Sequence, residues 1–164
     1  GHPVLAAGYD TDFYNLAQKN KEIFKRYRVK RIISNCPACV LMFNMYYKIP
    51  TQHISEILVQ HAEHFRTANE PVSYHRSCHL RKAENDAPER LLRKLGYELV
   101  PFPDQCCGAG GGLKQNKPEL AHKAAQSRLS QCRTNKIITA CPHCYQHLKE
   151  NASIKVMELS EVLQ

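Results

Sequence analysis

Five cysteines in the second half of the chain are of a residue type that binds metals or does redox chemistry. They are Cys78, the adjacent pair Cys106 and Cys107, and the two ends of a Cys-Pro-x-Cys turn, Cys141 and Cys144. Thiolate sulfur is the usual ligand of iron–sulfur clusters and a common ligand of zinc. These five side chains are therefore candidates for a metal or redox site.

Two further cysteines, Cys36 and Cys39, stand in a second Cys-Pro-x-Cys turn. Proline favours the first position of a helix, which puts the first cysteine of such a turn at the helix cap. The unpaired N–H groups and the partial positive charge at a helix N-terminus stabilise thiolates. No cysteine precedes Cys36 in the chain, so we interpret this pair as an incomplete metal site.

The two turns belong to an internal repeat. Residues 31–39 match residues 136–144 at an offset of 105 positions, and the same offset relates two similar segments that begin Ser-Glu. A constant register over this length predicts two related lobes. We assign residues 1–68 to the C-terminal part of a first, truncated lobe and residues 69–164 to a complete second lobe.

Hydrophobic periodicity predicts strands that alternate with helices. The expected strands are residues 30–34, 72–75, 98–102, 136–139 and 154–157, and the expected helices are residues 12–27, 37–46, 55–65, 87–95, 118–132 and 142–150. This alternation indicates an α/β fold made of Rossmann-like βαβ lobes with short parallel sheets.

Each group of cysteines in the second lobe follows a predicted strand. Cys78 comes after residues 72–75, Cys106 and Cys107 come after residues 98–102, and Cys141 comes directly after residues 136–139. The carboxyl ends of parallel strands form the ligand crevice of an open α/β sheet. We therefore expect cysteines that are far apart in the sequence to converge at one edge of the sheet.

The order Cys…Cys-Cys-Gly…Cys-Pro-x-Cys resembles the cysteine-rich CCG domain. That domain occurs in heterodisulfide reductase B and D subunits and in the iron–sulfur subunits of glycolate oxidase, lactate-utilisation enzymes and anaerobic glycerol-3-phosphate dehydrogenase. The resemblance implies that Cys78, Cys106, Cys107, Cys141 and Cys144 ligate an iron–sulfur cluster, a 4Fe–4S cluster of the cubane or the non-cubane kind.

The same resemblance implies an electron-transfer module of an oxidoreductase that oxidises 2-hydroxy acids or glycerol 3-phosphate or reduces disulfides. Its implied partners are a flavoprotein or other iron–sulfur subunits, and it would meet a membrane only through such a partner. Whether the chain is itself an enzyme stays open, and we do not expect this part of a larger protein to be active alone.

Composition argues against a secreted disulfide framework and against a nucleic-acid partner. The chain has eight cysteines among 164 residues, but it is not short and shows no secretory signal, which favours a reducing cytoplasm. Its net charge of +8 would attract nucleic acid. Metal-bound thiolates would cancel much of that charge, because ligating cysteines are deprotonated.

Two other functions remain open at this point. Four thiolates suit a structural zinc site, although five exceed what one zinc ion needs. A Cys-Pro-x-Cys turn could also serve as a dithiol–disulfide exchange pair. The histidines nearest the cysteines, His75, His79 and His143, are candidates to hydrogen-bond the centre, whereas we expect the remaining ones at the surface. We expect Cys132 to be a core thiol.

Overall fold

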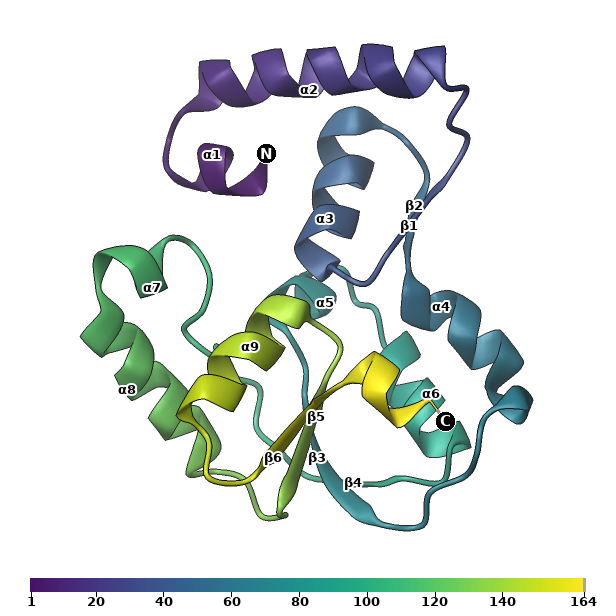
Figure 1. Ribbon diagram of the computed structural model, residues 1–164, viewed down its shortest axis with the longest axis vertical. Helices are drawn as coiled ribbons and strands as arrows, with labels where there is room; N and C mark the ends of the chain where they lie inside the picture. Colours follow the sequence, from purple (N-terminus) through teal and green to yellow (C-terminus); the bar gives the residue numbers. More distant parts are fainter. Residues whose placement is uncertain (164) are drawn as a thin grey trace.

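The computed structural model describes residues 1–163 and has an α/β fold (Figure 1). The first elements in chain order are α1 (His2–Ala6), α2 (Asp10–Arg26), β1 (Ile32–Ser34), α3 (Pro37–Met42), the π-helix η1 (Phe43–Tyr47), β2 (Thr51–His53), α4 (Ile54–Leu58) and the 3-10 helix η2 (Val59–His64). The remaining ones are β3 (Pro71–His75), α5 (Cys78–Lys82), α6 (Ala87–Lys94), β4 (Glu98–Val100), α7 (Leu113–Asn116), α8 (Pro118–Leu129), β5 (Lys136–Thr139), α9 (Pro142–Asn151), β6 (Lys155–Glu158) and the 3-10 helix η3 (Leu159–Val162).

The strands form two short parallel sheets, which confirms the predicted fold class. One sheet pairs β1 with β2, and the other has the strand order β4-β3-β5-β6. Figure 1 shows the two-stranded sheet with α1, α2 and α3 above the four-stranded sheet. The boundary between residues 68 and 69 stays a prediction, and Gln164, the last residue of the second lobe as assigned, lies outside the described residues.

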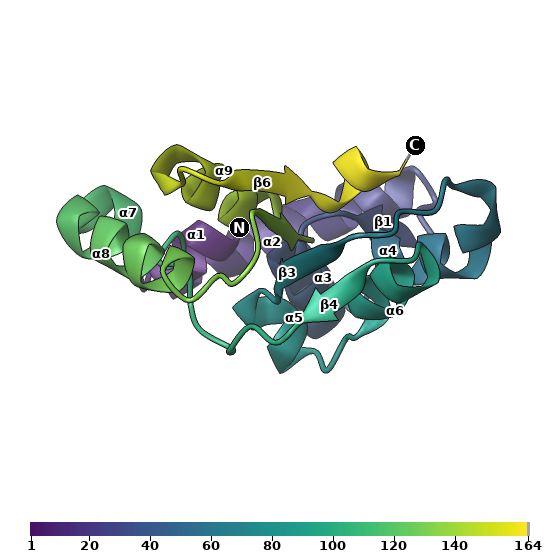
Figure 2. The same ribbon diagram turned by 90° about the horizontal axis from the view of Figure 1, so that it is seen from below.

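The four-stranded sheet buries both of its faces. Ile137 of β5 packs with Leu148 of α9 on one face. The next residue, Ile138, packs with Leu91 of α6 on the other face. This alternation follows from the period of two along a strand. Figure 2 shows the sheet from below, with α9 on one side and α5 and α6 on the other.

The first lobe departs from the expected pattern at α2. Phe13 and Ala17 are buried, whereas Leu16 and Ile23 of the same helix are exposed. Tyr27, the last residue of the helix predicted over residues 12–27, follows the end of α2 and is 72% exposed. Four short elements, α1, β2, α5 and α7, were not predicted, because their three to five residues are too few to establish a period. None of the helices within residues 1–163 is long and apolar enough to cross a membrane.

One buried histidine ties the two lobes together. His53, at the end of β2, is 1% exposed, so its expected surface position is wrong. Its Nε2 lies 3.2 Å from the carbonyl oxygen of Asn35 and 3.1 Å from that of Ala140. Its Nδ1 accepts a hydrogen bond from the N–H of Ser55, so His53 caps α4. Asn35 and Ala140 each directly precede a Cys-Pro-x-Cys turn. The His53 side chain therefore contacts the residue in front of each turn and joins the two lobes there.

The substitution His53→Ala tests this link. It removes the shared donor from two carbonyl groups and the cap from α4, and we expect it to lower the free energy of unfolding by about 2–4 kcal/mol. Urea unfolding monitored by circular dichroism measures the loss. His64→Ala is the matched control, since that side chain is exposed. Equal stability of the two variants would contradict the assigned role of His53.

Candidate metal centre

The five candidate cysteines of the second lobe meet at the point where the strand order of the four-stranded sheet reverses. The connection after β3 leads to α6 on one face, and the connection after β5 leads to α9 on the other face. The strands β3 and β5 are neighbours, with His75 opposite Thr139 at their carboxyl ends. The two connections diverge there and leave a crevice, which is where α/β sheets bind ligands.

Three connections deliver the thiols to this crevice. Ser77 caps α5 by accepting the N–H of Leu80 at 3.4 Å, which makes Cys78 the first residue of that helix. Cys106 and Cys107 lie in the loop between β4 and α7. Cys141 is the N-cap of α9 and Cys144 lies in its first turn.

The five sulfurs form one continuous run. Neighbouring thiols shift each other's pKa in the pairs Cys78 and Cys106, Cys106 and Cys107, Cys107 and Cys144, and Cys144 and Cys141. The sulfurs of Cys107 and Cys144 are 3.3 Å apart. No covalent bond joins any of the eight cysteines. The structure therefore brings together the five side chains that the sequence predicted, although their role as ligands stays a prediction.

The residue after the cysteine pair has to be glycine. Gly108 has φ +85°, a region that favours glycine. A Cβ at this position would lie 2.8 Å from the Cβ of Ala124 and 2.9 Å from the carbonyl oxygen of Ala121, both on α8. The close approach to α8 also turns the N–H of Gly108 toward the sulfur of Cys106, at 3.4 Å. The Cys-Cys-Gly sequence thus follows from both packing and hydrogen bonding.

The first-lobe pair lies close to this run without joining it. Cys36 is the N-cap of α3, and its sulfur accepts the N–H of Cys39 at 3.4 Å. The negative charge of Cys36 acts on Cys141, and that of Cys141 acts on Cys39. None of the thiol contacts described for the five cysteines includes Cys36 or Cys39. The expectation of a separate, incomplete first-lobe site stays a prediction.

The thiols differ strongly in acidity. Hydrogen bonds from Cys107 and Cys78, with a further one from the N–H of Gly108, lower the pKa of Cys106 to about 2. A hydrogen bond from Cys39 lowers the pKa of Cys36 to about 6. The hydrogen bond between Cys78 and Cys106 raises the pKa of Cys78. Without a metal the run therefore carries both thiolates and thiols.

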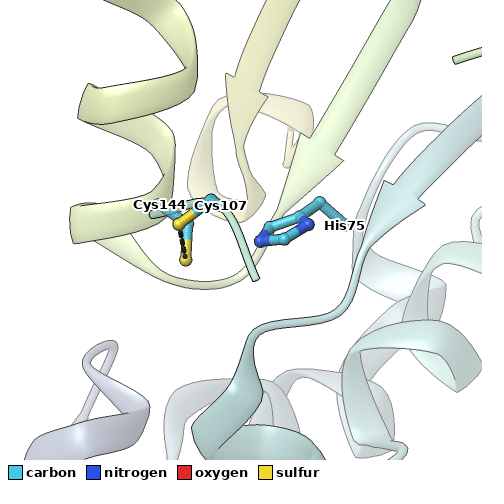
Figure 3. A group of neighbouring side chains, drawn as sticks. All are labelled: His75, Cys107 and Cys144. Carbon is cyan, nitrogen blue, oxygen red and sulfur yellow. Dashed lines mark hydrogen bonds between the residues drawn. The ribbon is translucent and has the colours of Figure 1, made fainter. Parts of the chain in front are cut away.

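One buried histidine faces the sulfurs. His75, at the end of β3, is 1% exposed, and a ring nitrogen lies within 4.8 Å of the sulfurs of Cys107 and Cys144 (Figure 3). Its Nδ1 accepts the Nε–H of Arg128 at 3.0 Å, whereas its Nε2 has no hydrogen-bond partner. Burial, and then the charge of Arg128, lower the pKa of His75 to about 3.

The other histidines divide between the crevice and the rest of the lobe. The Nδ1 of His79 lies 3.5 Å from the sulfur of Cys78, and its ring packs edge-on against His2 at 5.1 Å. His143 is exposed. His147, which we expected at the surface, is 3% exposed and contacts the carbonyl oxygen of Ala121. Helical periodicity could have revealed this, because His147 and Cys144 are both on the buried side of α9.

Arg128 is the functional candidate that sequence reasoning missed. Its side chain is 1% exposed, and its guanidinium carbon lies 3.2 Å from the ring centroid of Phe102. A single arginine in a helical stretch has no spacing that marks it as buried. Cys132, in contrast, is a partly buried thiol that contacts the carbonyl oxygen of Thr134, away from the five-sulfur run.

Alkylation of the metal-free, reduced protein tests the order of acidity. At about pH 6 an ordinary cysteine, with a pKa of about 8.5, is almost entirely protonated. We expect iodoacetamide to modify Cys106 and Cys36 first, because the thiolate is the nucleophile. Mass spectrometry of peptides after short exposures measures the rates. Cys78 is the matched control because it is exposed but has a raised pKa, and equal labelling of Cys78 and Cys106 would overturn the order.

Comparison with known proteins identifies relatives among iron–sulfur proteins. An uncharacterized iron-sulfur protein of Methanococcus maripaludis is 30% identical over 92% of this chain and 33% of that protein. One component of the fumarate reductase (CoM/CoB) of Methanothermobacter marburgensis is 28% identical over 99% of this chain and 37% of that protein. One component of the dihydromethanophenazine:CoB–CoM heterodisulfide reductase of Methanosarcina mazei is 27% identical over 91% of this chain and 43% of that protein.

The chain spans about a third of the length of the first relatives it matches. The model of one protein family, the cysteine-rich domain, matches residues 1–44 and 72–149. The second of these ranges contains all five cysteines of the run, and the first contains Cys36 and Cys39. The chain therefore belongs to the cysteine-rich domain family.

Proposed function

We propose that this chain is the iron–sulfur-binding, electron-transfer module of a larger oxidoreductase. The observation that carries the proposal is the continuous run of five thiols at the carboxyl edge of a parallel sheet. The names of the relatives, among them an iron-sulfur protein and subunits of two reductases, point in the same direction.

The donor set fits a sulfur-containing cluster. The crevice supplies five sulfurs and one buried ring nitrogen, Nε2 of His75, that has no hydrogen-bond partner. Buried donors are almost always paired, so an acceptor at this position would satisfy the orphaned group. Cluster sulfur is such an acceptor, and hydrogen bonds to sulfur are a known means of setting a cluster's potential.

A structural zinc site accounts for the crevice less well. Zinc takes four ligands in structural sites. A zinc ion would leave one of the five thiols without a role, and it brings no sulfide to accept a hydrogen bond from Nε2 of His75. The same run argues against dithiol exchange by Cys141 and Cys144, because both are buried and disulfide exchange requires access to the attacking sulfur.

Each part of the chain has a role in holding the cluster. We assign Cys78, Cys106, Cys107, Cys141 and Cys144 as its ligands, and the bound cluster supplies one-electron transfer. The side chain of Cys144, and then the N–H groups of Cys144 and His143 at the start of α9, lower the pKa of Cys141 and so favour its thiolate. The exposed side of the crevice, where Cys78 and Cys106 lie, is the side from which another protein can exchange electrons.

The finer assignments follow from the fact that the relatives are parts of multi-protein complexes. We infer that the physiological partner is a flavoprotein or another iron–sulfur subunit, and that any membrane contact is made through it. The cluster type, cubane or non-cubane, and the substrate of the complete enzyme are part of the same proposal. Reduction of a disulfide at the cluster is the second candidate, favoured by the relationship to a heterodisulfide reductase.

Anaerobic reconstitution with iron and sulfide tests the proposal. We expect about four irons and four sulfides per chain, as in a 4Fe–4S cluster, and an EPR signal that changes on reduction. Cys107→Ser removes the thiol at the centre of the run and should abolish most of the iron and sulfide. Chemical analysis of both elements after desalting is the measurement.

Two controls make the result specific. Cys132→Ser changes a thiol outside the crevice, and the double variant Cys36→Ser/Cys39→Ser changes the first-lobe pair. Both proteins should keep the wild-type iron and sulfide content. A content of one zinc ion per chain and no sulfide would contradict the proposal and would indicate a structural zinc site.

A further inference from the structure

The ring of His75 is held between a cation and the sulfurs. On one side Nδ1 accepts the Nε–H of Arg128 at 3.0 Å. On the other side Nε2, the far nitrogen of the ring, faces Cys107 and Cys144 (Figure 3). The side chain is 1% exposed, so the ring lies away from bulk water.

The contact with Arg128 determines which nitrogen carries the proton. A guanidinium group only donates hydrogen bonds, so Nδ1 must offer its lone pair. A neutral imidazole with an unprotonated Nδ1 carries its proton on Nε2. The buried ring therefore presents an N–H group to the sulfurs rather than a lone pair.

Arg128 is itself fixed in this orientation. Its guanidinium group stacks on the ring of Phe102, with 3.2 Å between the guanidinium carbon and the ring centroid. Its Nη1 donates to Gln131 at 3.3 Å. Among the residues that the structure describes, no carboxylate forms a salt bridge with Arg128. The negative charges that act on this buried cation are, in decreasing order, those of Asp104, Cys132 and Cys107, so the crevice contributes one of its anionic neighbours.

We propose that His75 is a neutral hydrogen-bond donor to the sulfurs of the metal centre and not one of its ligands, and that Arg128 is the positioning residue that fixes the donor tautomer. Ligation through Nε2 would require the ring to lose its last proton while Arg128 occupies Nδ1. The part of this inference that concerns a cluster rests on the proposed function, whereas the tautomer does not.

The donor should raise the reduction potential of the cluster. Reduction adds negative charge, and a hydrogen bond to sulfur stabilises the more negative state more strongly. Loss of the donor should therefore make reduction about tenfold less favourable, a shift of about 59 mV to lower potential for one electron.

The tautomer is tested first, in the metal-free protein. Nitrogen-15 NMR of histidine-labelled protein should show His75 protonated at Nε2 only. Arg128→Leu removes the donor to Nδ1 and should mix the two tautomers, whereas Arg128→Lys, which keeps a cationic donor, should restore the single tautomer. A proton on Nδ1 in the unaltered protein would overturn the inference whether or not a cluster binds.

The potential is tested in the reconstituted protein by EPR-monitored redox titration. His75→Leu should keep the iron and sulfide content and lower the potential, and His75→Gln, which retains an N–H donor, should stay near the wild-type value. His147→Leu is the matched control, a buried histidine of the same lobe that contacts only a backbone carbonyl. Loss of iron from His75→Leu, or an unchanged potential, would contradict the proposal.

The two proposals fail in different ways. If the unaltered protein binds no iron and sulfide, the proposed function fails, and the NMR experiment still decides the tautomer and the role of Arg128. If the cluster binds and the potential of His75→Leu equals that of the unaltered protein, the function stands and the donor role of His75 falls.

Discussion

The parallel pairing of β3 with β5 is the constraint on which the metal centre depends. The chain leaves β3 toward one face of the sheet and leaves β5 toward the other, so their carboxyl ends border an open crevice. Cys78 and Cys141 enter it from these two strands, and Cys107 enters from the loop after β4. A slip of one residue in the register would turn His75 and its neighbours to the opposite face, so the sheet core and the site depend on the same pairing.

The second constraint is electrostatic. Five thiols in contact cannot all ionise without compensation, because like charges at short range raise each other's pKa. The chain supplies compensation from fixed groups: the helix N-terminus at Cys141, the N–H of Gly108, and the buried cation Arg128 behind His75. These groups are already in place without a metal. A bound cation or cluster would neutralise the thiolate charge that these groups stabilise only in part.

The sequence predicted the features that follow from the internal repeat and from the position of each cysteine group after a strand. The 105-residue offset and the position of each cysteine group after a strand were enough to infer parallel α/β lobes and five converging thiols. It did not predict His53 or Arg128, because their roles come from contacts between residues 87 and 53 positions apart in the chain. Short elements such as β2 and α5 also lie below the length at which periodicity is informative. The helix predicted over residues 12–27 ends one residue earlier, at Arg26, which leaves Tyr27 as its C-cap.

X-ray absorption at the iron edge of the anaerobically reconstituted chain tests the central claim, that five thiols hold one cluster, most directly. We predict iron surrounded by sulfur only, with a second shell of neighbouring iron atoms, and loss of that iron shell when any one of the central thiols is replaced. Iron bound by nitrogen or oxygen with no neighbouring iron, or a preference for a single tetrahedral zinc ion, would contradict the claim.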